Sequence, residues 1–126
     1  MIKLTFCLRR LPQLSSTEFQ RYWLETHAPL VRKNQEALAI KRYVQTHADQ
    51  ADHGGLSEAL AAARGAPEPF DGTAELWFES REALTAAGAT AEGRAAGREL
   101  FEDEKRFIDH ARSPVWIGEE HEILAG

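Results

Sequence analysis

Alternating apolar and polar side chains predict four β-strands along the chain. In "MIKLTFCLRR" every second residue from Ile2 to Leu8 is apolar, which is the period of a strand with one buried face. The stretches "AIKRYVQTHA" (39–48), "GTAELWFES" (72–80) and "SPVWIGEEHEIL" (113–124) are predicted to be the second, third and fourth strands. Pro114 is acceptable at the start of the last strand because no ladder hydrogen bond is needed there.

Between the first two strands, a repeat of apolar residues every three to four positions predicts a helix. Ser15 and Glu18, three residues apart, have the spacing of a capping box at its start. Pro29 lacks a backbone donor and crowds the preceding turn, so we expect the helix to kink or break near His27 and to restart through Val31. The residues of the inward face are Phe19, Trp23, His27 and Leu30, with Tyr22 and Thr26 beside them.

Two further segments are predicted to be helical. Residues 48–71 form a long connection, and Leu56 to Arg64 within it predicts a short helix that ends at Gly65. The segment from Ser80 to Ala111 reads as a helix weakened by glycines near "AAGATAEGRAAG". Its second half carries an apolar stripe formed by Leu100, Phe101, Phe107, Ile108 and Ala111.

The resulting order βαββαβ predicts an α+β fold of the ferredoxin-like type, a four-stranded antiparallel sheet with both helices on one face. The other face of the sheet is expected to carry Trp77, Trp116 and Tyr43, whose positions have the opposite parity to the aliphatic residues. An apolar sheet face usually marks a partner surface, and a two-fold dimer is the commonest solution. We therefore predict a homodimer whose sheets pack face to face.

Composition limits the class of protein. The chain has 126 residues, which predicts one domain over 1–126, and 43% of them are hydrophobic. The net charge is -5 and the basic residues are spread out, which argues against nucleic acid or a membrane as partner. No apolar run is long enough to cross a bilayer and no signal peptide precedes Ile2, so a cytoplasmic location is expected. The single cysteine, Cys7, is expected to be a buried structural thiol.

Four stretches together resemble the EthD family of dimeric α+β barrel proteins: "SSTEFQRYWLETHAPLV", "KRYVQTH", "FDGTAELWFES" and "FEDEKRFIDHARSPVWIGEEHEI". The resemblance covers nearly the whole chain. It implies a single EthD-like domain, a homodimer, and a pocket between sheet and helices that holds a small aromatic or enolisable molecule. Family members are linked to ether degradation, lactone isomerisation and the dehydration or decarboxylation of aromatic polyketides, so the resemblance does not choose the reaction.

His27, Glu104 and His47 are the candidate catalytic residues. An imidazole on the inward face of a helix can act as a general base or acid, or it can cap the kinked helix end beside Pro29. Glu104 falls inside the apolar stripe, where a carboxylate is either paired with Arg9 or Arg42 or suited to proton transfer. His110, by contrast, falls on a face that is predicted to be exposed.

His47 begins the run "HADQADH", which includes Asp49, Asp52 and His53. This spacing matches no standard metal signature, so a solvated loop is favoured over a metal site, and no metal is predicted. His47 itself is a possible second acid or base. Four aromatic residues are candidate substrate contacts: Tyr22, Trp23, Tyr43 and Trp77. Base rates assign most such residues to the core or the dimer interface, and one or two of them are expected to line the pocket.

The chain has no phosphate-binding loop, dinucleotide fingerprint, zinc-protease motif or nucleophile elbow, so no cofactor is predicted. The leading hypothesis is a cofactor-independent acid/base enzyme, of the lyase, isomerase or dehydratase type, acting on a small aromatic or enolisable substrate. One alternative is a cofactor-free or haem-linked monooxygenase. Another is a non-enzymatic accessory protein that binds a small ligand.

Overall fold

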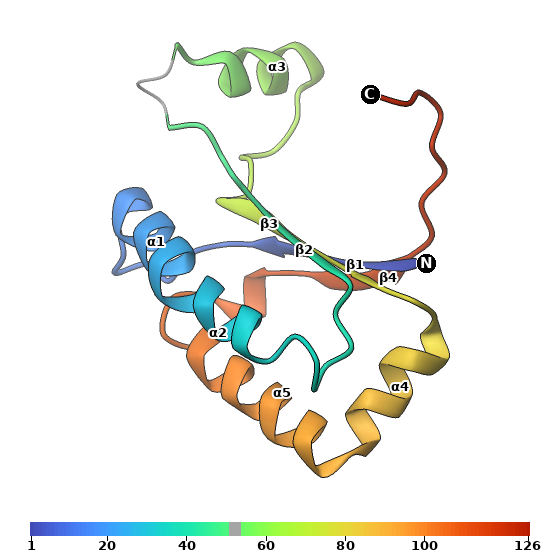
Figure 1. Cartoon of the computed structure of the whole chain (residues 1–126). Helices are drawn as coiled ribbons and strands as arrows, with labels where there is room; N and C mark the ends of the chain where they lie inside the picture. Colours follow the sequence, from blue (N-terminus) through green and yellow to red (C-terminus); the bar gives the residue numbers. More distant parts are fainter. Residues whose placement is uncertain (51–53) are drawn as a thin grey trace.

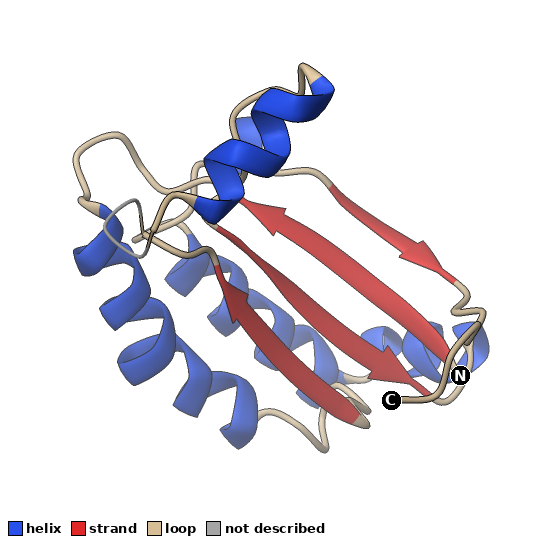
Figure 2. Ribbon diagram, turned by 90° about the horizontal axis from the view of Figure 1, so that it is seen from above, coloured by secondary structure: helices blue, strands red, loops and turns tan. Residues whose placement is uncertain are grey.

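The computed structural model describes residues 1–50 and 54–126. Four strands form one antiparallel sheet in the order β2-β3-β1-β4. Their bounds are β1 (Ile2–Leu8), β2 (Arg42–His47), β3 (Gly72–Phe78) and β4 (Val115–Gly118). Figure 2 shows the four strands side by side. The predicted α+β class and ferredoxin-like sheet are confirmed.

The helices other than α3 cover one face of this sheet (Figure 1). One rod is made of α1 (Ser16–Tyr22), the π-helical segment η1 (Trp23–His27) and α2 (Ala28–Lys33). The other is α5 (Ala91–Glu104), which follows α4 (Arg81–Ala89) and precedes the short 3-10 turn η2 (His110–Arg112). On the opposite side of the sheet lie α3 (Leu56–Arg64) and the C-terminal segment, residues 119–126 after β4 (Figure 1). No helix among the described residues is long and apolar enough to cross a membrane.

Local sequence signals place the start of α1 and the end of α3 where they were predicted. Ser15 Oγ accepts the Glu18 backbone N–H at 3.1 Å, and Glu18 Oε1 accepts the Ser15 N–H at 2.9 Å, so the capping box is formed. α3 ends at Gly65, whose φ of 61° is in the left-handed region that favours glycine. The predicted interruption between the last two helices occurs at Thr90, which caps the start of α5.

The first rod does not break at Pro29 but widens for one turn before it. Backbone hydrogen bonds in η1 run to the fifth residue, as the Ala28 N–H bonds to the Trp23 carbonyl. Residues spaced by four drift about 40° per step around a regular helix, so a long run of them would leave the inward face. The wide turn offsets this drift, and the buried residues of the rod recur every four positions: Phe19, Trp23, His27 and Val31.

The core lies between the sheet and these two rods and is built around two clusters. The first contains Phe19, Trp23 and Phe107 at the end where β3 begins, and the second contains Val31, Phe78 and Leu100. Gly72 opens β3 directly against the Trp23 ring, and a Cβ added there would lie 2.6 Å from a ring carbon. The indole and the sheet can therefore approach this closely only with glycine at the contact.

Three predictions about the elements are corrected. Tyr43 pairs with Leu76 in the sheet and packs on the helix side, not on the open face, because cross-strand register cannot be read from one strand's alternation. α5 ends at Glu104, so Phe107 and Ile108 are buried by the turn that follows it and not by a helical stripe. β4 ends at Gly118, well before the predicted end of the strand.

The face of the sheet that the main helices leave open is mixed, not uniformly apolar. Lys3 forms an ion pair with Glu75 at 2.6 Å, and the Lys3 ammonium and the Arg42 guanidinium both lie over the Trp77 ring. Trp77 also donates its indole N–H to Glu120 of the C-terminal segment. Cys7 points to this face yet is buried, as predicted, and that burial raises the pKa of its thiol.

Candidate functional site

His27 and Asp103 form a buried pair between the two helical rods. His27 ends η1 and is 5% exposed, and Asp103 lies in the last turn of α5 and is 3% exposed. His27 Nδ1 lies 2.7 Å from Asp103 Oδ2. Because a carboxylate only accepts hydrogen bonds, this contact places the proton of a neutral imidazole on Nδ1. Nε2 is then the atom that can accept a proton.

Asp103 is held in its charged form by three donors. In addition to His27, Tyr22 Oη donates to Asp103 Oδ1 at 2.6 Å and Arg106 Nη1 donates to the same oxygen at 3.0 Å. Burial by itself would raise the pKa of Asp103, but the hydrogen bonds from Tyr22, His27 and Arg106 outweigh it and hold that pKa below its ordinary value. Burial and the bond to Asp103 together raise the pKa of Tyr22, so its phenol stays protonated.

His27 lines a small cavity of about 50 Å³ between the sheet and the helices, and Asp103 is not part of its lining. Among the described residues, Nε2 of His27 has no hydrogen-bond partner. Tyr43 and Glu104 are the other polar residues of the lining, and the remaining walls are Phe6, Leu8, Trp23, Val31, Ala74, Leu76, Leu100 and Ile108. A base, a phenol and a carboxylate therefore meet in an otherwise apolar space.

Tyr43 is oriented by its neighbour on β2. Its hydroxyl oxygen accepts the Gln45 side-chain N–H at 2.8 Å, and Gln45 also donates to the Trp23 carbonyl at 3.0 Å. Burial raises the pKa of Tyr43, and the nearby charge of Glu104 adds to the effect. The phenolic proton is thus retained and is available for a group in the cavity.

Glu104 is paired, but not with the predicted partner. Its Oε1 lies 2.9 Å from His110 Nε2, and neither Arg9 nor Arg42 reaches it among the described contacts. The prediction that His110 is exposed is also wrong, since its ring is half-buried and stacks on Phe101 at 5.0 Å between centroids. The turn after α5 brings His110 back over the end of this helix. The prediction treated residues up to Ala111 as one continuous helix and therefore placed His110 on the exposed face.

The other candidate residues lie outside the cavity. His47 stacks on the far side of Trp23, with ring centroids 4.3 Å apart, and its Nε2 bonds to Gln45 Oε1 at 2.7 Å. Burial lowers the pKa of His47. Tyr22 contacts Asp103 instead of the cavity, and Trp77 lies on the open face. Of the four predicted aromatic contacts, only Trp23 and Tyr43 line the space beside His27.

Asp103 was missed from the sequence, although a signal for it existed. The buried positions of α5 and the turn up to Phe107 are Gly93, Ala96, Leu100, Asp103 and Phe107, which are separated by alternating steps of three and four. An aspartate within such a series is as unusual as Glu104 beside it. A carboxylate that is buried in this way needs a hydrogen-bonded partner.

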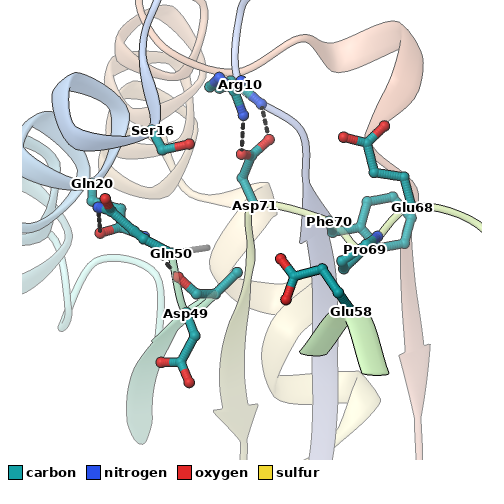
Figure 3. A pocket seen from close by; sticks show the side chains of 11 residues that line it. Arg10, Ser16, Gln20, Asp49, Gln50, Glu58, Glu68, Pro69, Phe70 and Asp71 are labelled. Carbon is teal, nitrogen blue, oxygen red and sulfur yellow. Dashed lines mark hydrogen bonds and ion pairs between the residues drawn. The ribbon is translucent and has the colours of Figure 1, made fainter. Parts of the chain in front are cut away.

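A larger and more polar hollow of about 530 Å³ lies between the start of α1, Glu58 of α3 and the residues that precede β3 (Figure 3). Arg10 and Asp71 form an ion pair at 2.5 Å on one side of it, while Asp49 and Glu58 also reach its wall. No group of three or more potential metal ligands occurs within 1–50 and 54–126. Asp52 and His53 of the "HADQADH" run lie outside the described residues.

A family model described as the EthD domain matches residues 11–111. The chain belongs to the EthD family. A crystal structure of an EthD family protein from Bacillus halodurans C-125 is 25% identical, with a TM-score of 0.62 over 96% of this chain and 99% of that one. HapK from Hahella chejuensis is 12% identical, with a TM-score of 0.61 over 100% and 98% of the two chains. A dimeric ferredoxin-like protein of unknown function from Thermobifida fusca YX is 13% identical, with a TM-score of 0.56 over 94% and 90%.

Proposed function

We propose that this EthD protein is a cofactor-independent acid/base enzyme that moves a proton at a carbon beside a carbonyl of a small aromatic substrate. The observation that carries the proposal is the buried His27–Asp103 pair, whose 2.7 Å contact engages Nδ1 of a histidine that lines the small cavity. A carboxylate behind an imidazole fixes its tautomer and stabilises the imidazolium that forms when it takes a proton.

Each polar group of the cavity has a role in such a transfer. His27 Nε2 removes the proton from the substrate carbon, and the Tyr43 hydroxyl donates a hydrogen bond to the oxygen on which negative charge develops. Glu104 is the second group able to take or give a proton, and its partner His110 connects it to the outside of the helix end. The apolar walls exclude water, which would otherwise solvate the developing charge. If the proton returns at another carbon the reaction is an isomerisation; if the carbanion instead expels a group from the neighbouring carbon, which leaves with a proton from Glu104 as a double bond forms, it is a lyase-type elimination.

The tautomer of His27 tests the proposal without a known substrate. Long-range ¹H–¹⁵N NMR spectra of the wild-type protein are expected to show that the tautomer of the neutral His27 ring carries its proton on Nδ1. A ring with its proton on Nε2 would leave no base facing the cavity and would contradict the mechanism.

Activity is tested by deuterium exchange at the CH₂ group of phenylacetone and its para-substituted derivatives in D₂O, followed by NMR. The His27→Gln variant is expected to exchange the probes about 10²–10⁴-fold more slowly than wild type, the range that one placed acid or base supplies. His121→Gln, at an exposed histidine of the C-terminal segment, is the matched control and should match wild type. Equal rates for the two variants would refute the role of His27.

We also propose that two copies associate through the open sheet face. Trp116 on β4 is 50% exposed there, and a like-folded protein is described as dimeric. Light scattering on the Trp116→Arg variant is expected to give a monomer, because the substitution places a charge in the interface. Leu24→Arg, at a 59% exposed residue on the helix side, should leave the dimer intact. A monomeric wild-type protein at micromolar concentration would exclude this arrangement.

A further inference from the structure

A second hollow adjoins the cavity that contains His27. It has a volume of about 240 Å³ and lies between α2 and the start of β2. Val31 and Tyr43 line both spaces, so the two hollows lie against the same two side chains. The larger hollow of Figure 3 shares no lining residue with the His27 cavity. Of these two hollows, the one beside α2 is therefore the one separated from His27 by the least protein.

Volume requires such an adjoining space. A cavity of about 50 Å³ holds one or two water molecules, since each occupies roughly 30 Å³ in the liquid. Small-molecule sites span about 300–1,000 Å³. The inner cavity and the hollow at α2 together approach the lower end of that range. A substrate whose reactive carbon reaches His27 must then extend past Val31 and Tyr43 into the outer hollow.

The charges of the outer hollow have one sign. Arg32, Lys41 and Arg42 line it, and no aspartate or glutamate does, although the whole chain has a net charge of -5. The Arg42 guanidinium lies over Trp77 at 4.6 Å and so points to the open face. Arg32 and Lys41, both solvent-exposed, are the cations left to meet a ligand at this mouth. Such a mouth favours an anion and attracts it from solution.

We propose that the substrate is an aromatic carboxylate, and this inference rests on the proposed function. Its carboxylate is held by Arg32 and Lys41 at the mouth, its ring passes Val31 and Tyr43, and its enolisable carbon lies beside His27. An arginine fork matches the two oxygens of a carboxylate, and a lysine adds a second, more flexible charge. The mouth thereby selects acids over neutral molecules of the same shape.

The test compares 4-(2-oxopropyl)benzoate with its methyl ester, which carry the same enolisable CH₂ group and differ in charge. Wild type is expected to have the lower KM for the acid. In the double variant Arg32→Gln, Lys41→Gln the KM for the acid should rise about tenfold, the combined effect of two partly exposed ion pairs, with kcat unchanged. The KM for the ester should not change. Raising the salt concentration should weaken binding of the acid alone.

Lys33→Gln is the matched control. Lys33 is adjacent to Arg32 on α2, but it pairs with Glu99 at 3.2 Å and does not line the hollow. This variant should leave both KM values at the wild-type level. An equal change in KM for acid and ester, or none in the double variant, overturns the proposal.

Equilibrium binding separates this inference from the mechanism on which it rests. Calorimetry on the His27→Gln variant should show binding of the acid that still depends on Arg32 and Lys41. If the acid binds in this way but wild type shows no His27-dependent exchange, the proposed catalysis fails and the anion site stands. If wild type exchanges both probes through His27 without preference, only the anion site fails. Binding of neither probe overturns the anion site.

Discussion

Replacing Asp103 with asparagine tests how the carboxylate controls His27. The side chain keeps its shape, but one oxygen becomes an NH₂ group that donates. The amide oxygen can still accept from Tyr22 and Arg106, which both contact Oδ1, so the NH₂ group faces His27 Nδ1. Nδ1 must then accept, and the ring proton moves to Nε2. The atom that faces the cavity can no longer take a proton.

The expected cost in stability follows from the same contacts. The bonds with Tyr22 and His27 lose the help of the carboxylate charge, and each falls from about 1.5–3 to about 0.5–1.5 kcal/mol, while the bond from Arg106 keeps the charge of the guanidinium. The free energy of unfolding should decrease by about 2–3 kcal/mol. Since small domains unfold at about 5–15 kcal/mol, the Asp103→Asn protein is expected to fold. Its exchange rate on the aryl ketones should fall about 10²–10⁴-fold.

Two further variants separate the tautomer from the loss of stability. Tyr22→Phe removes one donor to Asp103 but leaves the contact with His27, so it should lower stability by about 1–2 kcal/mol and keep most of the activity. Asp109→Asn, at a half-buried aspartate six residues after Asp103, should change neither the stability nor the activity. Urea unfolding and ¹H–¹⁵N spectra give the two quantities. An Asp103→Asn protein with its His27 proton still on Nδ1, or with wild-type exchange, would refute the reasoning.

Acid pH probes Asp103 in a second way. Its pKa in the folded protein is lower than the ordinary value of 3.8, so the unfolded chain binds the proton more readily. Its contribution to stability is therefore complete above that value and is lost as the pH falls through the lower pKa of the folded state. The Asp103→Asn protein is expected to have a flatter loss of stability below about pH 4.

Three other predictions concern residues around the site and at the start of the first rod. Glu104→Gln should reduce exchange by about 10²-fold with little change in the wild-type fold, as measured by NMR, and full activity would exclude a second proton-transfer group. Burial lowers the pKa of His47 below its ordinary 6.5, so the neutral ring's contribution to stability is complete above pH 6.5 and is lost as the pH falls through the lower pKa of the folded state. In urea unfolding measured at several pH values, the His47→Gln variant should lose less stability at acid pH than wild type. Ser15→Ala should lower the free energy of unfolding by about 1 kcal/mol through loss of the capping box, whereas no loss would mean that the helix end frays.

Local patterns in the sequence were sufficient for much of the fold. Ser15 and Glu18 define the start of α1 by hydrogen bonds between residues three positions apart. Gly65 caps the end of α3 because it adopts a left-handed backbone conformation. Such signals need no knowledge of the rest of the molecule. The inward direction of His27 was predicted on the same basis, because its neighbours Phe19 and Trp23 fix the face.

The site itself depended on contacts distant in the sequence, which local patterns do not contain. His27 and Asp103 are 76 positions apart, and nothing around either residue names the other. Glu104 was predicted to pair with Arg9 or Arg42 but pairs with His110 for a similar reason, since the turn after α5, which the pattern did not predict, brings His110 to it. Tyr43 was assigned to the wrong face because register between strands is set by pairing and not by alternation within one strand.

The extra residue in the turn from Trp23 to His27 gives this small fold an unusual freedom. Deleting one residue there would restore ordinary helical winding instead of breaking the rod, and the apolar stripe would still face the sheet at steps of three and four. The imidazole, however, would then lie three residues after Trp23 and would be turned by about 60° from it around the helix. A single deletion would thus turn the imidazole away from its position beside Asp103 while the fold is kept. Active and inactive forms of this fold can therefore differ by one residue.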